Sequence, residues 1–176
     1  IELLDVKPVV WRRLVVPADI LLPALHEVFQ VAFGWSNSHL HEFRIDGVRF
    51  AAPDPHGIDQ APMVGERRIL LAEAMRRHAR VFDYVYDFGD HWQHAVVLEE
   101  IYTRPVPRVA ARCLAGENAC PPENIGGPPG YDDFRAALVD PQHEAHEDFV
   151  ALYGQGFDPA LFDLDATNRA LEKLRV

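Results

Sequence analysis

The stretch from Tyr84 to His94 gathers more chemically capable side chains than any other part of the sequence. It reads Tyr-Val-Tyr-Asp-Phe-Gly-Asp-His-Trp-Gln-His, so carboxylates, imidazoles and aromatic rings surround one glycine. Asp87, Asp90 and His91 could form a carboxylate–imidazole pair for acid–base catalysis. An aspartate after a turn glycine also commonly bonds nearby backbone amides, and the sequence favours this structural role for Asp90.

Two histidines further upstream, His39 and His41, are spaced to meet one ligand. Side chains two positions apart on a strand point to the same side of the sheet, so both could bind one divalent ion with Asp87 or Asp90. The alternative, which the sequence favours, places one imidazole in the sheet and the other in water. The candidate binding surface comprises His39, His41, Asp87, Asp90, His91, Trp92 and His94.

Cys113 and Cys120, the two cysteines of the chain, lie in a segment rich in proline and glycine. With His39 and His41 they would suit a tetrahedral zinc ion, although paired ligands of a zinc finger are usually about two to four residues apart. Two reduced structural thiols are the favoured interpretation. A metal site and a disulfide are the alternatives, and a reducing compartment disfavours the disulfide.

The net charge of −10 is distributed unevenly along the chain. Residues 1–112 hold 15 acidic and 13 basic residues, whereas residues 113–176 hold 12 acidic and 4 basic ones. Acidic surfaces repel phosphate backbones, which disfavours nucleic acid as a partner. The local exception is a basic cluster, for which a solvated helix face is favoured over a contact with phosphate or an acidic partner. It comprises Arg67, Arg68, Arg76, Arg77 and Arg80, and the last three are the candidate contacts.

The elements that must position these side chains follow from the spacing of apolar residues. Residues 1–6 and 9–16 are predicted strands, and apolar spacing from Leu21 to Phe33 predicts an amphipathic helix that ends at Gly34. The dipeptide Asp46-Gly47 predicts a hairpin turn between residues 39–45 and 48–50. The other predicted elements are a strand pair at 81–88 and 94–102, loops at 51–65 and 113–130, and helices at 70–78, 131–139, 146–153 and 165–174, the last capped by Asp165 or Thr167.

This order of elements predicts an α+β domain. Its mostly antiparallel sheet of about five to six strands carries a helix packed across it in a β-grasp-like arrangement, with further C-terminal helices. Residues 1–112 would form the sheet domain, and residues 113–176 a Cys/Pro/Gly loop and acidic helices packed on it. No apolar run approaches the ~20 residues that span a bilayer, and no signal peptide is recognised, so we expect a cytoplasmic protein without membrane contact.

Eight segments of the sequence are informative when taken in order: residues 8–13, Gly34-Trp35, 39–43, 86–94, 113–123, Gly126-Gly127, 157–159 and 162–164. Together they resemble the plasmid pRiA4b ORF-3-like family over nearly the whole chain. This resemblance implies a bacterial or archaeal intracellular α+β domain found around plasmids and mobile elements, and it assigns no catalytic residues. A third cysteine often stands in the family where this chain has Ile125, which weakens the case for a thiolate-rich metal site.

Three functions follow as hypotheses. The leading one is a non-enzymatic binding module that uses the candidate surface to hold a protein partner. The second is a metal-dependent, hydrolytic enzyme that uses the His/Asp/Cys cluster around zinc or another divalent metal; no other cofactor is implied. The third is an accessory DNA-binding protein of a mobile element, which depends on Arg76, Arg77 and Arg80.

Overall fold

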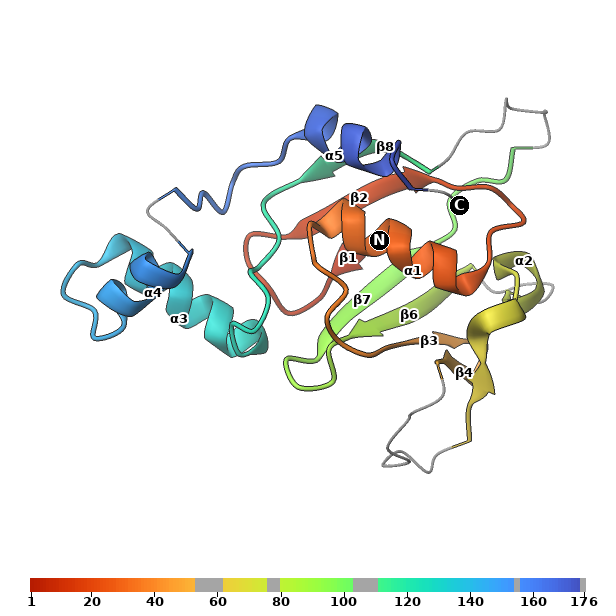
Figure 1. Ribbon diagram of the computed structural model, residues 1–176, viewed down its shortest axis with the longest axis horizontal. Helices are drawn as coiled ribbons and strands as arrows, with labels where there is room; N and C mark the ends of the chain where they lie inside the picture. Colours follow the sequence, from red (N-terminus) through yellow and green to blue (C-terminus); the bar gives the residue numbers. More distant parts are fainter. Residues whose placement is uncertain (53–61, 76–79, 103–110, 154–155, 175–176) are drawn as a thin grey trace.

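A single sheet organises the chain (Figure 1). The computed structural model describes residues 1–52, 62–75, 80–102, 111–153 and 156–174, and within them the sheet has eight strands. Among the strand pairs of the described residues, only β4–β5 is parallel. The strands lie in the order β5 (Val64–Gly65), β4 (Val48–Ala51), β3 (His41–Ile45), β6 (Val81–Tyr86), β7 (Trp92–Val97), β1 (Glu2–Leu3), β2 (Val10–Val15) and β8 (Arg112–Glu117).

The α+β class agrees with the sequence prediction, but the sheet is larger and mixed. Eight strands replace the predicted five to six because β5 and most of β8 come from segments that the sequence marks as loops. The β-grasp-like arrangement is not confirmed. Two strands, β6 and β7, lie between the β3–β4 hairpin and the β1–β2 pair.

Helix α1 (Leu22–Phe33) crosses one face of the sheet, as its apolar spacing predicts (Figure 1). It ends at Gly34, whose φ of 83° is favourable for glycine and whose N–H donates to the carbonyl of Gln30 at 2.8 Å. The same conformational rule explains the β3–β4 turn, where Asp46 and Gly47 have φ of 54° and 76°. The residues that α1 buries are Leu22, Leu25, His26, Val28, Phe29, Gln30, Ala32 and Phe33.

Strand β8 joins the sheet at its edge, beside β2, through a close approach that needs glycine. A Cβ on Gly116 would lie 2.8 Å from the Trp11 carbonyl oxygen. The buried Arg12 then ties three elements together: its Nε donates to Ala32 at the end of α1 (3.0 Å), and its terminal nitrogens donate to the carbonyls of Glu117 (2.8 Å) and Asn118 (2.9 Å). Its positive charge also lies at the negative end of the helix dipole.

The remaining helices lie at the ends of the sheet. Helices α3 (Gly127–Val139) and α4 (His146–Tyr153) pack through Phe134, Phe149 and Tyr153, whereas α5 (Leu164–Leu171) contacts β8 and α1. The side chain of Asp163, rather than Asp165 or Thr167, caps α5 by accepting from the Ala166 N–H at 2.8 Å. A short 3-10 helix, η1 (Glu66–Arg68), precedes α2 (Leu71–Ala74). Within the described ranges no helix is both long and apolar enough to cross a bilayer.

Candidate functional site

The β6–β7 turn divides the candidate binding surface into core and surface residues. Trp92 and His94 belong to the core, both 0% exposed, because they pair across the sheet with the equally buried Tyr86 and Tyr84. A buried side chain cannot contact a partner directly, so Trp92 and His94 are part of the core that packs beneath the turn and not of a binding surface. His91, with φ of 55°, and Phe88, 44% exposed, face outward.

The two aspartates of the turn are engaged by their own neighbourhood. Asp87 Oδ1 accepts the N–H of Gly89 at 2.9 Å, and its Oδ2 lies 3.5 Å from His39 Nε2. Asp90 Oδ2 accepts the N–H of Gly126, at the start of α3, at 3.2 Å. Asp87, rather than Asp90, therefore bonds the backbone amides of the turn, and the Asp90 side chain joins the turn to the segment that precedes α3.

His41 belongs to a different cluster from His39. Its Nε2 lies 3.1 Å from the carboxylate of the buried Glu66, and its ring stacks on His26 with centroids 3.5 Å apart. His26 in turn accepts from the Tyr84 hydroxyl at Nδ1 (2.7 Å) and donates from Nε2 to Asn37 Oδ1 (2.6 Å). Burial, helped by the neighbouring His41 and opposed by the Asn37 bond, lowers the pKa of His26 to about 3, so its ring is neutral.

Glu123 is the central acceptor on the outer side of this region. Its carboxylate accepts from the Ser36 N–H (3.0 Å), the hydroxyls of Ser36 and Ser38, and the hydroxyl of Tyr86. Burial would raise its pKa, but these hydrogen bonds outweigh burial and hold the pKa of Glu123 below its ordinary value. Burial and the bond to Glu123 raise the pKa of Tyr86 to about 12, so the phenol keeps its proton.

Unusual backbone conformations cluster around these side chains. Asn37, Asp87, His91 and Asn124 have φ of 56°, 55°, 55° and 59°, in the left-handed region that residues other than glycine seldom adopt. Such conformations persist where the surrounding structure fixes them, and they concentrate at functional sites. We call this region the sheet-end surface and define it by Ser36, Ser38, His39, Leu40, Phe88, His91 and Glu123.

The cysteines do not contribute to this surface. Both are free, and Cys113 is buried in β8 with its thiol 3.3 Å from the Ala115 carbonyl. Burial raises the pKa of both thiols, against the opposing effect of the nearby Arg12, so they are poor nucleophiles. Across the residues that the structure describes, no group of three or more His, Cys, Asp and Glu side chains could hold a metal ion. The candidate zinc ligands Cys113, Cys120, His39 and His41 therefore form no such group.

The basic cluster is only partly described. Arg67 and Arg68 are exposed on η1, and Arg80 is exposed just before β6. Arg76 and Arg77 lie outside the described residues, so the candidate contact with phosphate or an acidic partner stays a prediction.

Sequence reasoning missed three residues that organise the site. For His26 the sequence offered one signal, its position on the buried face of the predicted helix. For Glu66 the sequence offered no signal of a role in the site. Glu123 follows two prolines in the sequence, and a carboxylate there could accept hydrogen bonds. Nothing in the sequence indicated that Tyr86 is one of its donors.

Three comparisons with known proteins agree. The model of the family described as "Plasmid pRiA4b ORF-3-like protein" matches residues 1–166. The protein y4hQ of Sinorhizobium fredii (strain NBRC 101917 / NGR234), described as uncharacterized, is 41% identical over 170 residues, which are 96% of this chain and 87% of that protein. The crystal structure of MM3350, a protein of unknown function from Methanosarcina mazei Go1, is similar with a TM-score of 0.80 and 34% identity, over 93% of this chain and 92% of that one.

Proposed function

The chain belongs to the plasmid pRiA4b ORF-3-like family, and we propose that it acts as a non-enzymatic binding module that holds a basic protein partner on the sheet-end surface. The observation that carries this proposal is a pair of exposed apolar side chains, Leu40 and Phe88, on two segments joined by a backbone hydrogen bond, with the ionised Glu123 carboxylate bonded to Ser38, two residues before Leu40. Such a surface can bind without reorganising, which lowers the entropic cost of association.

The apolar half of the surface consists of Leu40 and Phe88, each 44% exposed. The Asp87 N–H donates to the Leu40 carbonyl at 2.9 Å, so the two segments are joined next to these side chains. An exposed aromatic ring next to an aliphatic side chain is a typical anchor for a protein partner, because its burial releases water from apolar area.

The polar half favours a basic partner. Glu123 keeps its charge through the bonds from Ser36, Ser38 and Tyr86, and it remains partly exposed. The whole chain carries a net charge of −10, which would steer a basic partner towards it over long distances. A lysine or arginine facing Glu123 would therefore fix the orientation of an apolar contact with Phe88.

Binding suits these side chains better than catalysis does. A general base must be free to take a proton from a substrate. Asp87 already accepts from the turn and faces His39, Asp90 bonds to α3, and both ring nitrogens of His26 have partners.

A crosslinking experiment followed by affinity measurement tests the proposal. A photoreactive amino acid in place of His91 should capture the partner in cells, and the purified partner should then bind the wild-type chain. Phe88→Ser and Leu40→Ser should each weaken the Kd by about tenfold. Val139→Ser on α3 is the matched control, because Val139 is 83% exposed and lies outside the surface, and it should leave the Kd unchanged.

Charge is tested separately with Glu123→Gln, which keeps the shape of the side chain. It should weaken binding and flatten the dependence of the Kd on salt. If Phe88→Ser and Leu40→Ser bind the captured partner within about twofold of the wild type, the sheet-end surface is not the binding site.

A further inference from the structure

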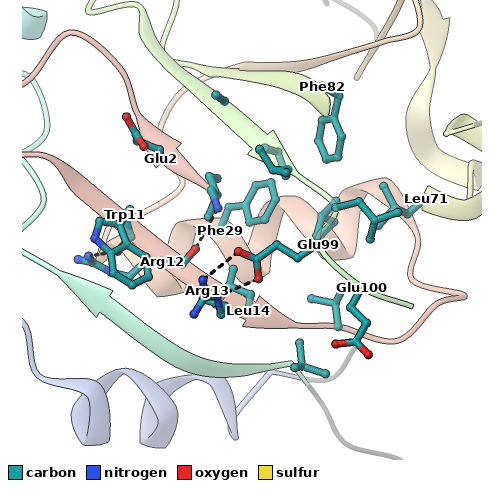
Figure 2. Close-up of a pocket in the computed structure, with 18 of the residues that line it drawn as sticks. Glu2, Trp11, Arg12, Arg13, Leu14, Phe29, Leu71, Phe82, Glu99 and Glu100 are labelled. Atoms are coloured by element: carbon teal, nitrogen blue, oxygen red, sulfur yellow. Dashed lines mark hydrogen bonds and ion pairs between the residues drawn. The ribbon is translucent and has the colours of Figure 1, made fainter. Parts of the chain in front are cut away.

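Strand β8 is the last strand at its end of the sheet, and helix α5 lies along its outer side. Figure 2, drawn around the cavity beside β2, shows β8 between the strand that carries Arg12 and the helix α5. The last strand of a sheet presents backbone N–H and C=O groups with which a strand of another chain can pair. This edge is separate from the sheet-end surface, so its interpretation does not depend on the proposed function.

Two residues of β8 direct their backbone polar groups to the outer side. The N–H and C=O of Arg12 bond to Ile1 on the inner side of β2, at 2.8 and 2.9 Å. Arg12 lies opposite Gly116 of β8, so these two residues form a pair without mutual backbone bonds, and Gly116 directs its N–H and C=O away from β2. Cys113 does the same, because its N–H and C=O bond to α5.

One side chain of α5 takes the place of a strand residue at this edge. Asn168 Oδ1 accepts the N–H of Cys113 at 2.9 Å, and Asn168 Nδ2 donates to the Cys113 carbonyl at 3.0 Å. A residue of an antiparallel strand would make the same two bonds, because a carboxamide carries the same donor and acceptor as the backbone. Phe162, just before α5, packs on the Arg12 guanidinium with its ring centroid 3.9 Å away, so the start of the segment is held beside β8 as well.

We propose that α5 is a releasable cover over a self-association edge, and that β8, once α5 leaves it, pairs antiparallel with β8 of a second copy of the chain. The structure describes all of α5, and Leu171 is its one fully buried residue, at 0% exposure. Segments that bury few apolar side chains open at a low cost in free energy. Release of α5 therefore leaves the rest of the sheet folded.

The sequence of β8 favours a second copy as the occupant. In a symmetric pair the two strands are related by a two-fold axis, which here passes through the middle of β8. This axis places Cys113 opposite Gly116 of the second copy, so the two residues with outward polar groups meet. It also places Arg112 opposite Glu117 of the second copy, and both side chains are exposed. Opposite charges that face each other across two strands stabilise the pairing, and like charges destabilise it.

Release of the cover is tested with Leu171→Asp, which places a charge at the buried position of α5. The amide of Cys113 should exchange its hydrogen at least about tenfold faster than in the wild type, because it loses the bond to Asn168. In sedimentation velocity the variant should form dimers with a Kd of about 10 µM, at least about tenfold tighter than any association of the wild type.

Charge reversal identifies the surface that associates. In the Leu171→Asp chain, Glu117→Arg would set two arginines opposite each other at both ends of the paired strands, so the Kd should weaken by at least about tenfold. Addition of Arg112→Glu restores the opposite charges and should restore the Kd. Glu147→Arg is the matched control, because it makes the same charge change at an exposed position on α4, and it should leave the Kd unchanged.

A second variant covers the case in which Leu171→Asp does not fold. Asn168→Asp keeps Leu171 in place and removes the donor to the Cys113 carbonyl, so it should also speed exchange of the Cys113 amide and strengthen association. The proposal is overturned if neither variant speeds that exchange, if the released chain stays monomeric, or if the wild type associates as tightly. It is equally overturned if the released chain associates with a Kd that the charge reversals do not change.

Discussion

Two buried histidines should make the protein lose stability as the pH falls from 7.5 to 5.0. His26 and His94 are 4% and 0% exposed, and burial lowers the pKa of each to about 3. In the unfolded chain each would titrate near the ordinary 6.5. Below that pH the unfolded chain binds protons that the folded protein does not. The contribution of each histidine to stability is therefore complete above pH 6.5 and is lost progressively as the pH falls towards 3.

The size of the effect follows from these pKa values. Between pH 7.5 and 5.0, each histidine that stays neutral when folded lowers the free energy of unfolding by about 2 kcal/mol. The two together lower it by about 4 kcal/mol, a large part of the roughly 5–15 kcal/mol that stabilises a typical domain. At pH 5.0 both folded groups are still neutral, so the loss is set by the titration of the unfolded chain.

Urea denaturation followed by tryptophan fluorescence at several pH values measures this loss. His94→Phe is the informative variant, because the ring lies among Phe33, Trp35 and Tyr84 and a phenyl ring suits those contacts. Whatever its stability at pH 7.5, it should lose about 2 kcal/mol less than the wild type by pH 5.0. His91→Asn, at an exposed position where asparagine tolerates the positive φ, is the control for removal of an imidazole. An equal loss in wild type and His94→Phe would refute the reasoning.

Further predictions concern the packing beneath the site. Arg12→Met removes a buried donor to backbone carbonyls and should lower the free energy of unfolding by about 3–5 kcal/mol in urea; a change below about 1 kcal/mol would contradict its joining role. Gly130→Ala would press a methyl group into the Ile125 carbonyl oxygen, so Tm should fall by about 5 °C or more, and an unchanged Tm in thermal melts would mean that the loop relaxes freely. Burial raises the pKa of Cys113 and Cys120, so a thiol reagent should label the folded protein at least about tenfold more slowly than the urea-unfolded chain; equal rates would show accessible thiols.

Elements that depend on local spacing were predictable from the sequence. The helix predicted from Leu21 to Phe33 is observed as α1 from Leu22 to Phe33, and the Asp46-Gly47 turn is observed between β3 and β4. Strand β8 was missed because its sequence, Arg-Cys-Leu-Ala-Gly-Glu, lacks β-branched residues and because it pairs with β2, which is far away in the chain. Its strand state comes from that tertiary pairing rather than from local preference.

The candidate site was predictable as a turn but not as a network. The spacing of Asp87, Gly89 and Asp90 indicated the turn, and the contacts agree. The number of residues in the turn decides which side of β7 faces the core, and the sequence did not reveal that Trp92 points inward. Glu123 accepts the hydrogen bond from Tyr86 because tertiary packing brings the two together. The two residues are 37 positions apart in the sequence, and no spacing rule relates residues at that separation.

The order of strands has a consequence for synthesis of the protein. The first strands made, β1 and β2, lie between β7 and β8, and β8 follows β2 by roughly 100 residues. At about 5–20 residues per second, a ribosome needs about 5–20 s to supply that partner. During this interval β2 has a bare edge, and Arg12 lacks the carbonyls of Glu117 and Asn118. Unpaired edges promote aggregation, so the nascent chain should need chaperone protection until residue 118 has left the ribosome, and products that terminate before β8 should be cleared by proteases.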